Sequence, residues 1–302
     1  MAMYLGSEKV AVTNTIEKQV PSMKAFFEAG GKCQGSTATS FEGCWQFDDT
    51  ANVTDMGNMF KNCKNLTTIT LFDTSKVTNM NEMFYYCPNI TTVPLFDTSK
   101  VTKMSYMFSE CYKLTTVPRF DTSKVTDMGY MFSNCSKLTS VQLFDTSNVK
   151  DMNAMFNYCS NLTTVPLFDT SKVTNMASMF YYCSKLTRVP LFDTANVKYM
   201  ASMLYGCSNI TTVPRFDTSK VTNMNYMFSN CGNLEAIHMI NINANLDISD
   251  STKFTREALL EIIGNLKAQT SGTKTLTMGA TNLAKLTDED KAIATNKGWT
   301  LA

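Results

Sequence analysis

The sequence contains a single histidine, His238, among its 302 residues. With one imidazole the chain cannot build a histidine-paired nucleophile or a histidine metal site. The cysteines supply no zinc site either, because no two of them stand in a C-x₂₋₄-C pair. The recurring aspartates lack the glycine-rich nonapeptide of calcium-binding stacks, so we interpret them as turn residues. We therefore expect a protein that is not an enzyme and that uses no metal or other cofactor.

An excess of charge and a long apolar run are also missing. The 27 basic and 26 acidic residues leave a net charge of +1, which argues against a nucleic acid or an anionic membrane as partner. No apolar stretch approaches the roughly 20 residues that cross a bilayer, so we expect no membrane insertion. The first residues, MAMYLGSEKV, lack the basic start and apolar core of a signal peptide, and the sequence shows no anchor.

What the sequence does have is a strict internal repeat of 24 residues. Its clearest marker is a cysteine that returns in register through most of the chain. The eight positions are Cys63, Cys87, Cys111, Cys135, Cys159, Cys183, Cys207 and Cys231. A fixed period of this length predicts a stack of coils, each burying its apolar side against its neighbours. Because the cysteines lie beside Met and Phe in identical settings, we expect free, buried thiols.

Each copy changes its hydrophobic period along its length. Met80, Met83, Phe84 and Cys87 fall at i, i+3, i+4 and i+7, which predicts a helix of about two turns capped by the Asp or Asn before the first Met. A run such as Ile90–Pro94 then predicts a short strand that ends at its proline. The following Asp predicts an Asx turn. The fold class is therefore α/β: a right-handed solenoid of strand-turn-helix coils with a parallel sheet, curved with the strands inside.

The repeat also divides the chain into regions. Residues 1–40 are predicted to be an N-terminal cap, with a strand over 4–13 and a helix over 22–29. Residues 41–240 form the solenoid. Residues 241–302 are predicted to be a C-terminal capping region, in which two helices and two strands close the stack. These elements are a helix over 255–267, a strand over 274–278, a helix from Thr287 to the residue before Gly298, and a strand over 299–301.

The recurring FDTSKVTxMxxMFxxCxxLTxVP resembles the leucine-rich repeats of the BspA-like bacterial surface protein family, relatives of the Treponema-type repeat. The resemblance covers residues 41–240. It implies a leucine-rich-repeat solenoid that binds other proteins or cell surfaces and is often exported and attached to the cell wall.

Positions that vary between copies are the candidates for binding, because packing fixes the others. On the outer face of the predicted helices these positions hold tyrosines among small polar residues, a composition typical of antibody binding sites. They are Tyr85, Tyr86, Tyr106, Tyr130, Tyr158, Tyr181, Tyr182, Tyr205 and Tyr226. The alternative is that these rings only cover gaps between neighbouring helices. On the strand side, Arg188 interrupts a threonine ladder, and Arg119 and Arg215 lie near the strand exits; these three arginines are the other candidates.

These features together predict a non-enzymatic recognition or adhesion module that binds a protein or glycan on a cell surface. The alternative is a phage virion component, tail-associated or receptor-binding, that uses the same solenoid for host attachment. The absence of an export signal favours the virion, and the family resemblance favours the cell surface. The expected location is accordingly a cell surface or a virion.

Overall fold

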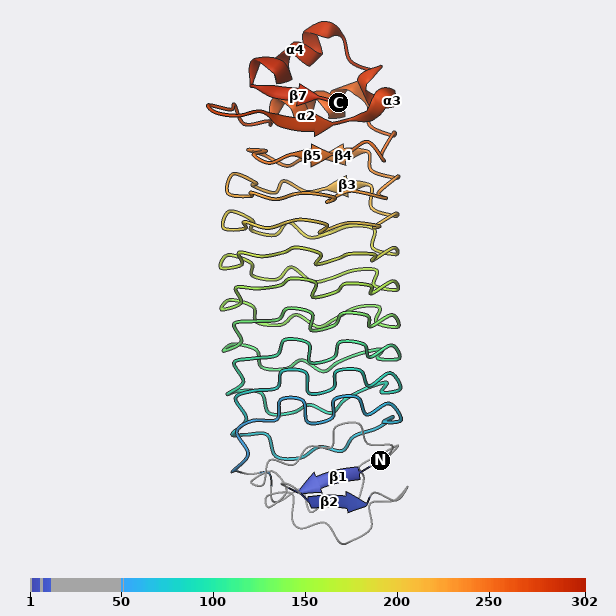
Figure 1. Cartoon of the computed structure of the whole chain (residues 1–302), viewed down its shortest axis with the longest axis vertical. Coiled ribbons are helices and arrows are strands. Elements are labelled where there is room, and N and C mark those ends of the chain that lie inside the picture. The colour runs from blue at the N-terminus through green and yellow to red at the C-terminus, as the bar shows by residue number, and fades with distance from the viewer. Residues whose placement is uncertain (1, 6–7, 12–49, 51) are drawn as a thin grey trace. The chain divides into compact units, whose positions relative to one another are not determined.

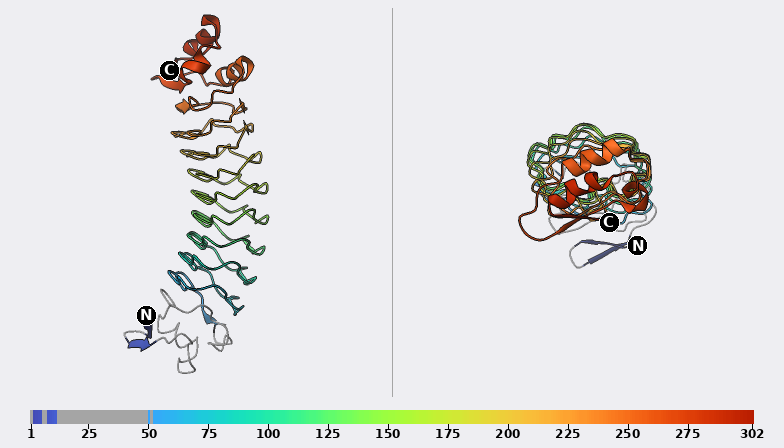
Figure 2. Two further views of the ribbon diagram at one scale, coloured as in Figure 1. Left: turned by 90° about the vertical axis from the view of Figure 1, so that its right-hand side faces the viewer. Right: turned by 90° about the horizontal axis from the view of Figure 1, so that it is seen from above.

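The computed structural model describes residues 2–5, 8–11, 50 and 52–302, which fall into two compact units, Met1–Val149 and Lys150–Ala302. In each unit the 24-residue copies form flat coils that stack on one another (Figures 1 and 2). The N-terminal unit begins with strands β1 (Ala2–Leu5) and β2 (Glu8–Ala11), which pair antiparallel. The single strand predicted over 4–13 is therefore wrong, because residues 4–5 and 8–11 belong to two different strands. The helix predicted over 22–29 lies outside the described residues.

The helix predicted in each copy is also wrong, because the segment from residue 80 to 87 forms consecutive tight turns. The N–H groups of Met83 and Cys87 bond to the carbonyl oxygens three residues back, both at 3.2 Å. The N–H groups of alternate residues instead bond to the next coil, as Phe84 N does to Met107 O at 2.9 Å. A helix bonds only within itself and needs 8–10 Å to its neighbour. Turns satisfy the backbone across the closer spacing of a 24-residue coil, and the coils are consequently turn and extended structure.

The Asp and Asn residues predicted to cap those helices do accept backbone N–H bonds, but within a turn and not at a helix start. Asp55 Oδ1 accepts from Gly57 N at 2.7 Å, and Asn79 Oδ1 accepts from Asn81 N at 3.0 Å. In the copy where Lys103 replaces the cap, Ser105 N bonds to Asn81 Oδ1 of the neighbouring coil, also at 3.0 Å. The Asp or Asn thus closes an Asx turn rather than starting a helix.

The predicted parallel strands are confirmed at one place among the repeats. β3 (Thr212–Val213) pairs parallel with β4 (Ala236–Ile237), and β3 ends at Pro214 as expected. Elsewhere in the described coils, single parallel bridges such as Asp55 with Asn79 and Asn175 with Tyr199 lie outside the predicted strands, at the position before the first Met of each copy. Proline explains part of this shortfall, since it has no N–H to donate to a neighbouring coil.

The core of each unit is a set of vertical ladders of identical side chains. In the copy 95–118 all eight residues predicted to point inward are buried: Phe96, Val101, Met104, Met107, Phe108, Cys111, Leu114 and Val117. The rings of Phe84 and Phe108 stack with centroids 5.6 Å apart and planes 3° apart. The eight cysteines of the repeats are free and buried, which confirms the prediction of core thiols.

Ring centroids of equivalent residues in neighbouring coils of the C-terminal unit are 4.7 Å apart for Tyr181 and Tyr205, 5.8 Å for Phe156 and Phe180, and 6.4 Å for Phe168 and Phe192. On the tyrosine side backbone hydrogen bonds also join the coils, as from Tyr182 N to Tyr205 O at 2.7 Å. The predicted sense of curvature, with the strands inside, stays a prediction.

The C-terminal region confirms the elements predicted from Thr255 onward. Helix α2 (Arg256–Gly264) starts at the Thr255 cap, β6 is Lys274–Thr277, α4 is Asp288–Asn296, and β7 is Trp299–Leu301. The prediction missed β5 (Leu246–Asp247) and α3 (Gly279–Leu283). Strands β5, β6 and β7 form one parallel sheet.

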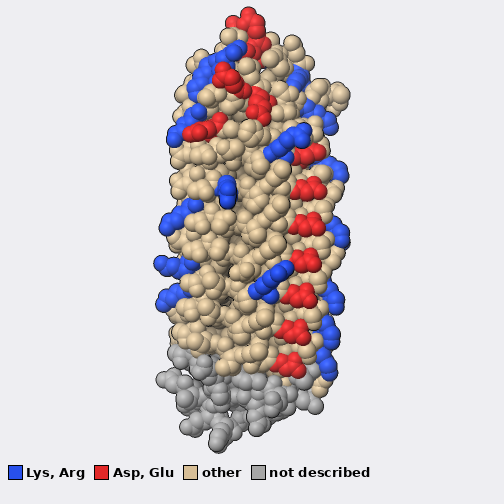
Figure 3. All heavy atoms as spheres, turned by 180° about the vertical axis from the view of Figure 1, so that it is seen from behind, with Lys and Arg blue, Asp and Glu red and all other residues tan. Residues whose placement is uncertain are grey.

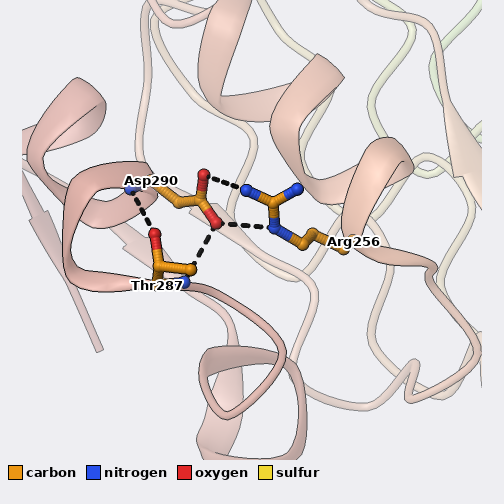
Figure 4. Close-up of polar contacts among 3 residues, drawn as sticks. All are labelled: Arg256, Thr287 and Asp290. Atoms are coloured by element: carbon orange, nitrogen blue, oxygen red, sulfur yellow. Dashed lines mark hydrogen bonds and ion pairs between the residues drawn. The ribbon is translucent and has the colours of Figure 1, made fainter.

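An ion pair joins the two longer helices of this region (Figure 4). The Arg256 guanidinium donates to both carboxylate oxygens of Asp290, at 2.8 and 2.7 Å. Asp290 Oδ2 also accepts from Thr287 N at 2.9 Å, which completes a capping box at the start of α4. The hydrogen bonds from Arg256 and the Thr287 backbone lower the pKa of Asp290.

Candidate recognition surface

Most of the tyrosine candidates lie at positions of the turns where the backbone is left-handed. Two positions per coil have positive φ, as at Glu82 and Tyr86, both with φ 56°. Six of the nine predicted tyrosines take this conformation. They are Tyr86, Tyr106, Tyr130, Tyr158, Tyr182 and Tyr226. Left-handed backbone favours glycine and asparagine, and other copies do place Asn58, Asn134 or Gly206 there.

In the N-terminal unit the structure brings three predicted tyrosines together. The rings of Tyr106 and Tyr130 stack with centroids 4.5 Å apart and planes 5° apart. Tyr85 meets Tyr106 edge-on at 6.4 Å, and Lys61 Nζ lies 5.0 Å from the centre of the Tyr85 ring. Burial raises the pKa of Tyr106, and the neighbouring phenols and carboxylates raise it further. Tyr86 instead contacts Tyr112, at 6.3 Å, a residue that was not a predicted candidate.

In the C-terminal unit four predicted tyrosines form a second cluster. Tyr158 stacks on Tyr182 at 5.2 Å, Tyr181 stacks on Tyr205 at 4.7 Å, and Tyr181 meets Tyr182 edge-on at 5.0 Å. Tyr226 is 65% exposed. We call the two clusters, with Tyr226, the tyrosine surfaces. These rings stack between neighbouring coils and still reach solvent. They can therefore both cover gaps and contact a partner, the two roles that the sequence left open.

The predicted arginines are exposed, and the structure places them beside a feature that the sequence analysis missed. Arg119 and Arg215 precede a buried Phe, at a position where five other copies have an exposed leucine. These leucines are Leu71, Leu95, Leu143, Leu167 and Leu191. A comparison of copies at this position would have revealed them, because a leucine that alternates with arginine is unlike a core residue. Arg188 lies instead at the position of the exposed Thr92.

The aspartates of the Phe-Asp-Thr segment close the predicted Asx turns. Asp73 Oδ1 accepts from Ser75 N at 2.8 Å, and Asp97 Oδ1 accepts from both Ser99 N and Ser99 Oγ, at 3.0 and 2.7 Å. These hydrogen bonds from serine lower the pKa of both carboxyls. Figure 3 shows the acidic side chains of each unit in a column flanked by basic ones.

Groups that could support chemistry are few in the described part of the chain. No cluster of three His, Cys, Asp or Glu side chains there has the arrangement of a metal site. The one histidine, His238, contacts Glu261, with Nδ1 2.8 Å from Oε1. In the described part of the chain, no helix has the length and apolar character needed to span a membrane.

These features define a repeat protein whose stacked coils present columns of variable side chains. A family model described as "Mycoplasma protein of unknown function, DUF285" matches residues 22–140, 54–165, 89–187, 133–237 and 163–257. These overlapping matches extend over most of the chain, which belongs to the DUF285 family. No curated protein matches it.

Two solved structures are similar to part of the chain. The plant peptide hormone receptor RGFR1, solved in complex with RGF2, is 12% identical over 72% of this chain and 38% of its own, with a TM-score of 0.32. A leucine-rich repeat protein from Bacteroides ovatus is 14% identical over 83% of this chain and 88% of its own, with a TM-score of 0.20. This chain thus spans little more than a third of the plant receptor chain.

Proposed function

We propose that this protein is a non-enzymatic recognition module that binds a protein or glycan on a cell surface through its tyrosine surfaces. The observation that carries the proposal is the placement of six tyrosines on left-handed backbone. Repeats of the DUF285 family and the resemblance to BspA-like surface proteins support the cell-surface setting. Attachment of a phage to its host would use the same surfaces and stays a prediction.

The backbone energetics indicate that the tyrosine rings serve more than packing. A left-handed conformation costs a non-glycine residue about 1–2 kcal/mol. The stacking of two rings returns about 0.5–1.5 kcal/mol. Asn134 or Gly206 fills an equivalent corner without that conflict. Tyrosine therefore gains little stability at these corners, and strained residues of this kind cluster at binding sites.

The test removes the rings while relieving the backbone. In one variant Tyr106 and Tyr130 become Asn, and in a second Tyr158 and Tyr182 become Asn, since Asn is the residue that other copies use there. Binding is measured to bacterial cells and to a glycan array, and stability by thermal unfolding. We expect binding to fall at least tenfold in the variant whose cluster makes the contact, with a melting temperature within a few degrees of the parent.

Two controls make the result specific. Ser202→Asn changes a non-tyrosine residue at an equivalent left-handed corner and is expected to leave binding unchanged. Replacing Arg119, Arg188 and Arg215 by Gln tests the other candidate surface. Full binding by both tyrosine variants, together with a loss in the arginine variant, would move the site to the strand side and overturn the proposal.

A further inference from the structure

The N-terminal unit carries two neighbouring columns of opposite charge. In successive coils an exposed aspartate begins the Asx turn, and an exposed lysine follows it three positions later. The pairs are Asp73 and Lys76, Asp97 and Lys100, and Asp121 and Lys124. Figure 3 shows an acidic column with basic side chains along its edge. We call the three aspartates and three lysines the charge columns.

The charge columns are not neutralised within the unit. The turn bonds of the three aspartates all go to Oδ1. Among the described residues, none of the six side chains has an ion-pair partner within 4.0 Å. Lys100 and Lys124 donate no hydrogen bond to another described residue, and Lys76 donates to Asn52 Oδ1 at 2.7 Å. Each coil thus holds an acidic and a basic group ready for an outside partner.

A hollow beside the acidic column has the chemistry to receive a lysine side chain. Leu71 and Leu95, each 58% exposed, line it together with Asp73 and Asp97. A lysine side chain is apolar along its stem and charged at its end, so the stem can contact a leucine while the ammonium reaches a carboxylate. Since the unit's own lysines form no ion pair with these aspartates, the lysine that fits the hollow comes from another molecule.

We propose that two copies of this chain associate through the charge columns, with the lysine column of each copy against the aspartate column of the other. Lys100 of one copy then meets the partner's Asp97, and Lys76 meets the partner's Asp73. One surface supplies both halves of the contact, as a two-fold interface between identical chains requires. A partner that carries charge of one sign is repelled by one of the two columns, which favours a second copy as the occupant.

The order of the columns selects the direction in which the two copies lie. A two-fold axis parallel to the stack exchanges the left and right columns of the facing copy, so that aspartate faces lysine. An axis across the stack keeps their order, so that aspartate faces aspartate. Like charges repel, and the two copies are therefore parallel. The parallel axis also sets each coil level with the same coil of the partner, so the match does not depend on the spacing between coils.

The contact is centred on the coils of Asp73 and Asp97. In the next coil Arg119 stands at the leucine position, two residues before Asp121, and competes with an incoming lysine for that carboxylate. The coil after it has Asn148 in place of the lysine. Exposed ion pairs are individually weak and are screened by salt. We therefore expect a weak, salt-sensitive dimer to which the leucines of the hollow add apolar contact.

Sedimentation equilibrium of the full chain over a range of protein concentrations, at low and at physiological salt, measures the association. We expect an equilibrium between monomer and dimer whose dissociation constant rises about tenfold between the two salt concentrations. A chain that stays monomeric at millimolar concentration in low salt would overturn the proposal.

Two matched variants separate the columns. In the first, Asp73 and Asp97 become Asn, which keeps the turn because Asn79 Oδ1 accepts the same type of bond. In the second, Lys76 and Lys100 become Glu. We expect each variant alone to associate about tenfold more weakly than the parent. An equal mixture should form a tighter dimer than either variant alone, because the aspartates of the second face the lysines of the first. Self-association equal to that of the parent in either variant, or a mixture no tighter than its components, would contradict the proposed contact.

Single cysteines test the direction of the two copies. Ser75 and Ser99 lie between the aspartate and the lysine of their coils, and hence next to the proposed axis. We expect Ser75→Cys and Ser99→Cys each to give a disulfide-linked dimer with oxidised glutathione, above the background of the parent, whose repeat cysteines are buried. Antiparallel copies bring at most one of these positions against itself. Cross-linking of one variant alone, or of neither, would exclude the parallel arrangement.

Discussion

At the scale of single residues, the buried cysteines show how the coils use a side chain that is usually considered reactive. The thiol of Cys111 donates to the carbonyl of Phe84 in the preceding coil, with Sγ 3.2 Å from the oxygen. The same bond recurs from Cys87 to Phe60 and from Cys231 to Leu204, at 3.0 and 2.9 Å. Burial raises the pKa of Cys111 and of Cys231 to about 12.

This shift predicts a loss of stability at alkaline pH. An unfolded thiol ionises near pH 8.5, whereas the folded thiol stays neutral to about pH 12. The stability that the shift contributes is thus complete below about pH 8.5 and is lost as the pH rises toward 12. We expect the Cys111→Ser variant, whose hydroxyl donates in place of the thiol without titrating, to lose about 1–2 kcal/mol less than the parent between pH 8 and 10. Urea unfolding at each pH measures this, and parallel curves for the two proteins would contradict it.

At the scale of the element, each coil is joined to the next by a buried threonine on the side where backbone bonds are sparse. Thr98 Oγ1 donates to Asp121 O at 2.8 Å, and Thr122 Oγ1 donates to Asp145 O at 2.7 Å. Both threonines are almost fully buried. Each hydroxyl thus satisfies a backbone carbonyl of the next coil.

The threonine bond predicts a difference between two conservative variants. Thr98→Val keeps the shape and leaves the Asp121 carbonyl without its donor, so we expect a loss of about 1–3 kcal/mol in the free energy of unfolding. Thr98→Ser keeps the hydroxyl and removes one methyl group, which costs about 1 kcal/mol. Urea denaturation of both variants compares them. A Thr98→Val protein as stable as the parent would show that the hydroxyl bond contributes nothing.

The repeat and its inward side chains could be read from the sequence, whereas the backbone conformation of the turns could not. Met80, Met83, Phe84 and Cys87 are buried as their spacing predicts, yet two successive tight turns bury the same positions as a two-turn helix. The difference between the helix and the turns lies in the stacking distance, because packed helices need 8–10 Å and neighbouring coils lie closer together. The elements of the C-terminal region follow local rules: β7 has the predicted bounds, and α2 begins one residue after the predicted start and ends three residues before the predicted end.

The candidate surface was predicted to a similar extent. The tyrosines could be selected because they vary between copies, but their left-handed backbone depends on the turn that was not foreseen. The exposed leucines were missed because leucine in an apolar run is ordinarily assigned to the core. Pro94 and Phe96 flank Leu95 and hide it in the pattern.

At the scale of the whole molecule, contacts within each unit run along the stack from one coil to the next. A coil bonds to the coil before it and the coil after it, so its stability depends on those two interfaces and on its own turns. Bonds from Thr74 to Asp97 and from Thr98 to Asp121 are equivalent, at 2.8 Å each. Each 24-residue coil therefore offers the neighbouring coil the same set of hydrogen-bond partners.

This equivalence predicts that an entire coil can be removed. Deletion of residues 95–118 joins Pro94 to Arg119 and keeps the 24-residue register, so that Thr74 meets Asp121 in place of Asp97. We expect a folded protein with a similar circular dichroism spectrum, cooperative unfolding in urea and a slightly smaller m-value, since less surface is exposed on unfolding. Deletion of residues 95–106 removes half a coil, sets turn positions against core positions, and should unfold the stack around it. If both deletions were equally disruptive, the coils would not be interchangeable, and the stability of the unit would depend on contacts beyond nearest neighbours.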